Sequence, residues 1–236
     1  MSTTSLDSGL PGRLDAVRAR IASAAIRSGR SPEAVRLIAV SKTFGADAVR
    51  AAHAAGQNDF GENRVQEALA KQAETADLPL RWHLIGHLQS NKANKVAGAF
   101  AAVQSVDSTD LLERLARAAD SVGTPLPVLI QVDLAHESTK SGLDETDLRP
   151  LLARAQALGG VRVEGLMVLP PYAEDLEQVR PWFARLRTLR EALLTEGVPA
   201  EQLRELSMGM SHDFEVAIEE GATIVRVGSA IFGSRS

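Results

Sequence analysis

A lysine closes the first strongly apolar run of the chain. Residues 37–44 read LIAVSKTF, and Lys42 follows directly on the apolar part of that run. Partial burial of a lysine favours its neutral amine, and a neutral amine can attack an aldehyde to form a Schiff base. The competing interpretation is that Lys42 reaches solvent or pairs with a carboxylate such as Glu62. The residue types therefore leave both a reactive amine and an ordinary ion pair open.

The other lysines offer few substitutes for such a role. Only five of the 26 lysine and arginine residues are lysines. Lys71 and Lys95 fall within helical patterns, whereas Lys92 and Lys140 are predicted in loops that follow strands. Lys92 and Lys140 are thus the rivals of Lys42. Lys140 could also hold a ligand transiently, or be an ordinary exposed loop lysine.

Two segments near the C-terminus carry residues suited to holding an anion. In ELSMGMSHDFEVAIEEG, Ser211 is predicted to be a helix N-cap, and Gly209 before it would let the backbone come close to a ligand. In TIVRVGSAIFG, Gly228 and Ser229 present backbone N–H groups and a hydroxyl at the start of a short last helix. Each feature alone is typical of an ordinary cap. The two together, opposite Lys42, predict a phosphate site.

Arg226 lies between Val225 and Val227, so its guanidinium needs an acceptor inside the fold. A carboxylate such as Glu62 or Asp107 is one predicted partner, and the ring nitrogen of a bound cofactor is the other. Arginine only donates hydrogen bonds, so it would leave such a nitrogen unprotonated and the ring a weak electron sink. The lysine, the anion site and this arginine together fit an aldehyde that carries a phosphate, pyridoxal 5'-phosphate (PLP) above all.

A repeated strand and helix pattern would bring these residues together. After a leading amphipathic helix over residues 13–29, short β-branched runs alternate eight times with helical stretches. Continuous apolar strands, each followed by a helix, indicate a parallel sheet covered on its outer face. Eight units in this length favour an α/β fold of the (β/α)8 barrel type over an open doubly wound sheet. No glycine-rich dinucleotide turn follows the first strand, which also favours the barrel.

Composition restricts the function classes further. The 236 residues have a formal net charge of -4, which gives no reason to expect a nucleic acid partner, and they include no cysteine. The N-terminus is polar and lacks a signal peptide pattern, and no run is long enough to span a membrane. We therefore expect a polar leader over residues 1–12 and one barrel domain over residues 13–236, in a cytoplasmic protein.

Histidine and tyrosine give only weak candidates for catalysis. His83 and His87 are separated by a strand end and a glycine turn, which does not give the helical spacing of zinc proteases, so no metal site is expected. Tyr172, the only tyrosine, follows the sixth strand and could reach the barrel mouth as a base. Pro170 and Pro171 beside it instead favour a rigid loop that places the ring on the surface.

Seven motifs, read in order, give the chain a family resemblance. They are AVSKTF, FGENRVQEA, WHLIGHLQSNK, SVDS, ESTKSG, GLM and LSMGMSHDFEVAIEEGATIVRVGSAIFG. Over residues 10–235 the sequence resembles the pyridoxal phosphate homeostasis protein family. The resemblance implies a modified TIM barrel, similar to the N-terminal domain of alanine racemase, with an extra N-terminal helix and a monomeric state.

The resemblance also assigns site residues. It implies that PLP is carried on Lys42, that Arg226 faces the ring nitrogen, and that Asn63 and His83 line the cofactor pocket. It implies that the phosphate is held by the SMGMS loop and by Gly228 with its neighbour. The full implied cofactor-binding set is Lys42, Asn63, His83, Ser207, Met208, Gly209, Met210, Ser211, Arg226, Gly228 and Ser229. Residues 133–136 depart from the asparagine-containing stretch that relatives often show, so no role is carried over to that loop.

We predict a protein that stores, buffers or delivers PLP through a Schiff base on Lys42, without robust turnover. Apo forms of PLP-dependent enzymes are the candidate acceptors. In alanine racemase a tyrosine from a second domain is the opposing base, and this chain ends after the barrel. The alternative from another class is a small PLP enzyme, an amino-acid racemase or decarboxylase. A class I aldolase that uses the same lysine without a cofactor is a third hypothesis, and such a protein would be colourless.

Overall fold

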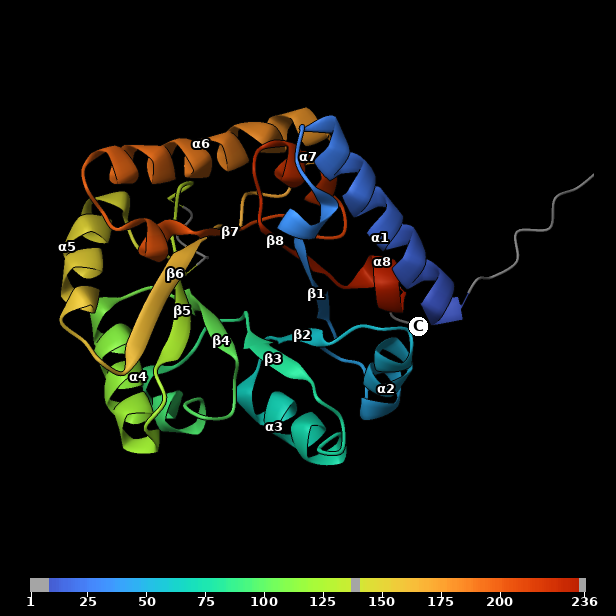
Figure 1. Ribbon diagram of the computed structural model, residues 1–236, viewed down its shortest axis with the longest axis horizontal. Coiled ribbons are helices and arrows are strands. Elements are labelled where there is room, and N and C mark those ends of the chain that lie inside the picture. Colours follow the sequence, from blue (N-terminus) through green and yellow to red (C-terminus); the bar gives the residue numbers. More distant parts are fainter. Residues whose placement is uncertain (1–8, 137–140, 234–236) are drawn as a thin grey trace, which may run out of the picture.

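Eight parallel strands form one closed barrel in the computed structural model of the protein, which describes residues 9–136 and 141–233. The strands follow one another around the barrel in chain order, and the last pairs with the first to close it. Figure 1 shows the strands at the centre with the helices around them. The predicted (β/α)8 barrel is confirmed.

Strands and helices alternate along the chain with one exception. The strands are β1 (Arg36–Val40), β2 (Asp59–Glu62), β3 (Arg81–Leu84), β4 (Ala102–Val106), β5 (Leu126–Gln131), β6 (Val161–Met167), β7 (Glu205–Ser207) and β8 (Ile224–Val227). The α-helices are α1 (Gly9–Arg27), α2 (Ala46–Ala54), α3 (Val65–Glu74), α4 (Thr109–Val122), α5 (Glu145–Gln156), α6 (Leu176–Thr195), α7 (Phe214–Glu219) and α8 (Ser229–Phe232). The 3-10 helices are η1 (Pro32–Ala34), η2 (Ser90–Lys95) and η3 (Ala200–Leu203).

The exception follows β3, where η2 takes the place of an α-helix. The prediction of an α-helix after every strand is therefore wrong at this position. The segment contains Ser90, Asn91 and Asn94, and such side chains compete for backbone hydrogen bonds and disfavour a longer helix.

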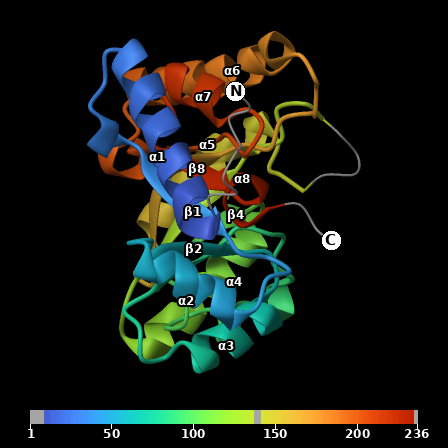
Figure 2. The same ribbon diagram turned by 90° about the vertical axis from the view of Figure 1, so that its right-hand side faces the viewer.

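The leading helix α1 covers the barrel beside its last two helices. It buries Leu14, Val17 and Ile21 and packs against α7 and α8, as Figures 1 and 2 show. Arg27 at its end pairs with Glu219 of α7 at 2.9 Å. The helix begins at Gly9, inside the segment expected to be a polar leader, and residues 1–8 lie outside the described part of the chain.

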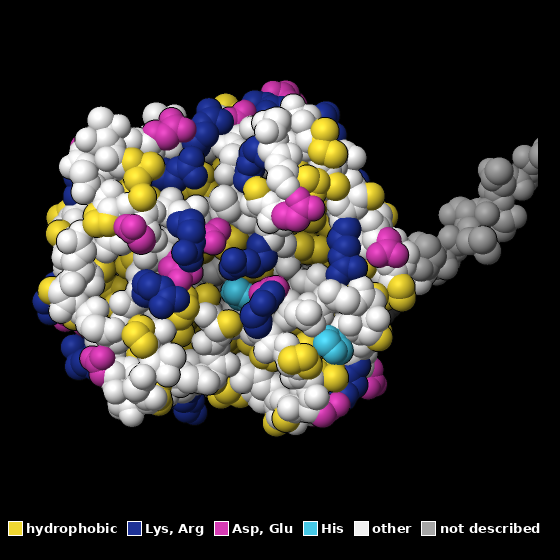
Figure 3. Space-filling model, viewed as in Figure 1, with side chains coloured by type: hydrophobic (Ala, Val, Ile, Leu, Met, Phe, Trp, Pro, Cys, Tyr) yellow, Lys and Arg dark blue, Asp and Glu magenta, His cyan; other side chains and the backbone are white. Residues whose placement is uncertain are grey.

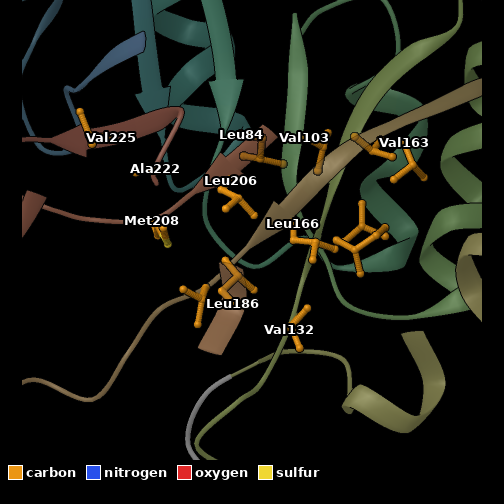
Figure 4. Close-up of a cluster of buried hydrophobic side chains, with 14 of the residues drawn as sticks. Leu84, Val103, Val132, Val163, Leu166, Leu186, Leu206, Met208, Ala222 and Val225 are labelled. Atoms are coloured by element: carbon orange, nitrogen blue, oxygen red, sulfur yellow. The ribbon is translucent and has the colours of Figure 1, made fainter. Parts of the chain in front are cut away.

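Two apolar layers hold the barrel together. The larger lies between the strands and the helices, and its members Leu166, Leu186 and Leu206 lie close together in Figure 4. The smaller cluster consists of Ile38, Leu129, Met167 and Ile224. These four come from β1, β5, β6 and β8, so they fill the inside of the barrel. None of the described helices is both long and apolar enough to cross a membrane.

Ion pairs link strands at the amino end of the barrel. Arg36, the first residue of β1, lies 3.6 Å from Glu205 of β7, and Arg81 of β3 pairs with Asp59 of β2. Charged side chains of both signs gather at the centre of the face seen in Figure 3. The amino end of such a barrel serves stability, so the functional site is expected at the opposite, carboxyl end.

Candidate functional site

A cavity of about 610 Å³ opens at the carboxyl ends of the strands. Its lining includes Lys42 after β1, Asn63 after β2, Ile85 after β3, Tyr172 after β6, Ser211 after β7 and Ser229 after β8. Segments far apart in the sequence therefore meet at one mouth. This is the arrangement that the parallel strand pattern predicts.

Lys42 is exposed at this cavity. Among the described residues it has no hydrogen-bond or ion-pair partner. The predicted pairing with Glu62 is wrong, because Glu62 is fully buried and its Oε1 lies 2.6 Å from Nζ of Lys71. The expected partial burial of Lys42 is also wrong, since the turn after β1 carries the side chain beyond the packed part of the strand. The amine is therefore accessible to a ligand in the cavity.

None of the other described lysines lines the cavity. Lys92 is half-buried in η2, Lys95 is exposed in the same element, and Lys71 is buried in α3. Lys140, the second predicted rival, lies outside the described residues. Within the described ranges, the geometry thus favours Lys42 over its competitors.

Ser211 and the start of α8 form one polar cluster in the cavity wall. Oγ of Ser211 accepts hydrogen bonds from the backbone N–H of Gly228 at 3.1 Å and of Ala230 at 3.3 Å. The two segments predicted to bind an anion therefore meet. The predicted N-cap role of Ser211 is wrong, because the chain first makes a turn and Asp213 is the N-cap of α7. Oδ1 of Asp213 accepts the Met210 N–H at 2.6 Å.

Only part of the SMGMS loop reaches the cavity. Met210 and Ser211 line it, whereas Ser207 and Met208 are fully buried and do not. Gly209 has a φ of +93°, and a Cβ there would come within 2.6 Å of a side chain of α7. This glycine is therefore required for its backbone conformation and for packing on α7, not for the approach of a ligand. Three of the five predicted loop residues therefore lie behind the cavity wall and do not line the cavity.

Arg226 is buried and contributes to the cavity lining. Its side chain donates hydrogen bonds to Oγ of Ser207 at 2.5 Å and to the carbonyl oxygen of Val168 at 3.1 Å. Ser207 in turn donates to Oε1 of Gln104 at 2.6 Å. A chain of buried polar groups therefore fixes the guanidinium in place.

The predicted ion pairs of Arg226 are wrong. Glu62 faces α3, and Asp107 contacts Nδ1 of His87 at 3.2 Å. Burial lowers the pKa of Arg226 from 12.5 to about 10, although the attraction of Asp213 opposes this change. The guanidinium is therefore still cationic at neutral pH, and it can donate to a ligand in the cavity.

Asn63 and His83, both predicted to line the pocket, lie at different depths. Asn63 lines the cavity, but His83 is buried deeper in the barrel, and Ile85 two residues later takes the lining position. Nε2 of His83 contacts Oδ1 of Asp59 at 2.9 Å. Burial alone would raise the pKa of Asp59, but the hydrogen bonds from His83 and Arg81 outweigh it and hold this pKa at about 2. His83 thus supports the amino end of the barrel.

Tyr172 stands at the rim of the cavity. Its side chain is 78% exposed, and its ring centroid lies 5.6 Å from that of His212. The predicted surface position is confirmed, and the ring also reaches the cavity mouth.

The two histidines considered for metal binding have separate partners. His83 contacts Asp59, whereas His87 contacts Asp107. Within residues 9–136 and 141–233, no group of three or more His, Cys, Asp or Glu side chains could hold a metal ion.

Sequence reasoning missed three residues around Lys42 and the polar cluster. Thr43 has a φ of +71°, which is exceptional for a β-branched residue. The ring of Phe44 lines the cavity and stacks on Phe232 at 5.1 Å. Burial raises the pKa of Asp213 above its usual value, despite the opposing effects of the Met210 N–H and Arg226. Phe44, Asp213 and Phe232 lie within the quoted motifs, whereas nothing in the sequence indicates a positive φ at Thr43.

A family model described as alanine racemase, N-terminal domain, matches residues 13–236 of the chain. The chain belongs to this family. The pyridoxal phosphate homeostasis protein of Pseudomonas aeruginosa is 50% identical to this member of the alanine racemase N-terminal domain family over 220 residues, which is 93% of each chain. The pyridoxal phosphate homeostasis protein of Aquifex aeolicus is 44% identical and covers 94% of this chain and 97% of its own. The resemblance inferred from the motifs is therefore confirmed.

Similar solved structures have the same barrel. PipY of Synechococcus elongatus PCC7942, solved with PLP bound, has a TM-score of 0.84 and 45% sequence identity, and the match covers 95% of this chain and 100% of PipY. Alanine racemase from Streptomyces coelicolor A3(2) has a TM-score of 0.69 at 23% identity, and the match covers 94% of this chain and 59% of the racemase. The second likeness concerns the fold alone, and it confirms the predicted similarity to the racemase barrel.

Proposed function

We propose that this protein binds PLP in the cavity at the carboxyl ends of its strands and acts in PLP homeostasis, by storing, buffering or delivering the cofactor. The observation that carries the proposal is the exposed Lys42, which has no partner among the described residues and shares a cavity with Ser211 and Arg226. The relative PipY has been solved with PLP bound, and the curated relatives are named homeostasis proteins and not enzymes.

The residues present fit each part of the cofactor. The Lys42 amine would hold the aldehyde carbon, and the guanidinium of Arg226 would donate to the ring nitrogen. The hydroxyl of Ser211 and the N–H groups of Gly228 and Ala230 already converge, and the same groups would hold the phosphate. Backbone N–H groups at a helix start favour an anion. The rest of the proposed lining is Asn63, Met210 and Ser229, and the support is Ser207, Met208, Gly209 and His83.

Attachment of PLP to Lys42 would require no catalytic group other than the Lys42 amine. The Lys42 amine would hold the aldehyde carbon by a condensation that releases one water molecule and requires no oxidant or reductant. When bound, PLP supplies an electron sink for the chemistry of amines. Arg226 would weaken that sink, because it only donates and leaves the ring nitrogen without a proton. This chemistry supports holding the cofactor more than turning over a substrate.

The proposal extends to the setting of the protein. We place its action in the cytoplasm, as a monomer with one barrel domain over residues 13–236. Apo forms of PLP-dependent enzymes are the proposed acceptors. The support is the name of the curated relatives, because homeostasis of a cofactor requires exchange with the proteins that use it.

Visible spectroscopy with borohydride reduction tests the assignment of Lys42. Purified protein is mixed with PLP, reduced, digested and mapped by mass spectrometry. We expect a visible band that disappears on reduction and a modified peptide that contains Lys42. Lys42→Ala should abolish both without changing the far-UV circular dichroism, because the exposed side chain is outside the core. Lys92→Ala is the matched control and should behave as the wild type.

Three results would contradict the proposal. A reducible adduct that persists in Lys42→Ala and maps to Lys92 or Lys140 would move the site. Turnover of an amino acid at ~1 to 1000 per second would replace the carrier by a racemase or decarboxylase. Reaction of Lys42 with other aldehydes, without uptake of PLP, would instead support a class I aldolase.

A further inference from the structure

A buried ion pair on the outer side of the barrel hydrogen-bonds to Ser41, the residue that precedes Lys42. Nζ of Lys71 in α3 lies 2.6 Å from Oε1 of Glu62 and donates to the carbonyl oxygen of Ser41 at 2.7 Å. The hydroxyl of Ser41 donates to the same Glu62 oxygen at 2.6 Å. Ser41 and Glu62 are fully buried, and Lys71 is only 8% exposed. The pair therefore holds Ser41 by both its side chain and its backbone.

The turn that contains Lys42 starts at Ser41. The N–H of Phe44 donates to the carbonyl oxygen of Ser41 at 3.0 Å, so Lys42 and Thr43 are the two central residues of a tight turn. Thr43 has a φ of +71°, and a turn with positive φ at its third position normally has glycine or asparagine there. The left-handed backbone disfavours ordinary L residues by roughly tenfold in population. The turn is thus opposed by the conformational preference of its own threonine.

Both ends of the turn are anchored, and its functional side chain is not. At the exit, the ring of Phe44 stacks on Phe232 of α8 with ring centroids 5.1 Å apart. At the entrance, the N–H of Ser41 donates to the carbonyl oxygen of Gly61 at 3.1 Å, in addition to the contacts with the ion pair. Lys42 between these anchors projects at the cavity without a partner among the described residues.

Stability alone does not account for the buried pair. Such a pair is often no more stabilising than apolar side chains of similar volume. Oε2 of Glu62 is buried and has no hydrogen-bond partner in the part of the chain that the structure describes. We propose that Lys71 and Glu62 are positioning residues, which hold the turn of residues 41–44 against the preference of Thr43 and so keep the Lys42 amine at the cavity. This inference deepens the proposed function and rests on it.

The test removes the ion pair without leaving a buried charge unpaired. In the double variant Glu62→Gln with Lys71→Met, the amide oxygen can still accept the Ser41 hydroxyl. The rate at which the visible band forms with PLP should fall roughly tenfold, because the turn is populated less. Hydrogen exchange of the Phe44 amide in the cofactor-free protein should accelerate by a similar factor. Lys95→Met, which removes an exposed lysine, is the matched control and should change neither rate.

Thr43→Gly separates positioning from a general structural role. Glycine adopts a positive φ without strain, so adding Thr43→Gly to the double variant should restore the attachment rate to within about threefold of wild type. In the wild-type background the same substitution should slow exchange of the Phe44 amide, because glycine relieves the strain at this position. A pair that merely stabilised the barrel would lower Tm when removed, and Thr43→Gly would not rescue the rate.

The outcomes distinguish this inference from the function on which it rests. If the wild type attaches PLP at Lys42 and the double variant does so equally fast, the positioning role is overturned and the proposed function stands. If the wild type forms no adduct at Lys42, both are overturned. If the double variant does not fold, Thr43→Gly alone decides, and unchanged or faster exchange of its Phe44 amide would refute the strained turn.

Discussion

Replacing Arg226 by methionine should stabilise the cofactor-free protein while weakening its hold on PLP. Arg226 is only 3% exposed, and burial lowers its pKa from 12.5 to about 10 despite the attraction of Asp213. Each pKa unit corresponds to ~1.4 kcal/mol, so keeping this guanidinium charged inside the barrel costs the folded state about 3 kcal/mol.

Two lost hydrogen bonds offset part of this gain. The substitution removes the donors to Ser207 and to the Val168 carbonyl, at ~1 kcal/mol or less each, while Ser207 keeps its bond to Gln104. The expected net change is therefore an increase of about 1 to 3 kcal/mol in the free energy of unfolding. For a base whose folded pKa is lowered, the cost is fully present below about pH 10 and is relieved as the pH rises towards 12.5. The gain should thus be equal at about pH 6 and about pH 8.

Urea unfolding followed by circular dichroism measures this change, and a spectroscopic titration measures PLP affinity. Arg117→Met is the matched control, because Arg117 is 65% exposed and its ion pair with Glu113 is long, at 3.8 Å. Its effect should stay within about 0.5 kcal/mol. A loss of more than about 1 kcal/mol in Arg226→Met would refute the reasoning, because it would mean that the polar contacts outweigh the burial of the charge.

Three further predictions concern the barrel and its rim. Asp59→Asn should lower the free energy of unfolding by at most about 2 kcal/mol at neutral pH, because the pKa of this carboxylate is lowered from 3.8 to about 2 in the folded protein. The stability that it gives is present above pH 3.8 and is lost as the pH falls towards 2. Acid titrations of both proteins check this, and an unchanged acid transition would contradict it. Gly165→Ala should cost about 3 kcal/mol in urea unfolding, since its Cβ would overlap the carbonyl oxygen of Glu205; a variant as stable as wild type would show that β6 and β7 can move apart. Tyr172→Phe should leave the PLP spectrum and affinity unchanged, because the side chain is 78% exposed, and a clear loss of affinity in the titration would assign its hydroxyl to the site.

The barrel and the convergence of the site were predictable because they depend on patterns along the chain. Continuous apolar strands separated by helices fix a parallel sheet, and parallel strands place their carboxyl ends at one edge. Lys42, Ser211 and Gly228 follow strands, and Arg226 lies near the carboxyl end of β8, so their meeting in one cavity follows from the fold.

The pairings of the polar side chains were not predictable in the same way. Glu62 was expected to face Lys42 or Arg226, but β2 turns its side chain outward to Lys71 of α3, and this depends on strand register and helix placement. His83 lies deeper in the barrel than its motif implied. His83 and Ile85 point to the same side of the strand, and the sequence does not show which of them lies at the level of the cavity. Thr43 gave no signal at all, since threonine is among the residues least expected at positive φ.

Charged side chains are paired with opposite charges at the amino end of the barrel, whereas Lys42 and Arg226 at the carboxyl end are not paired in this way among the described residues, and this difference supports a role as a PLP carrier. At the amino end Arg36 and Arg81 are paired with carboxylates, which serves stability. At the carboxyl end Lys42 is exposed without a partner among the described residues, and buried Arg226 hydrogen-bonds to oxygens that carry no charge. A racemase would also need a base fixed opposite the amine, yet Tyr172 is 78% exposed, and its ring lies beside that of His212. An accessible amine beside the proposed anion site can take up an aldehyde cofactor and release it again to water or to another amine.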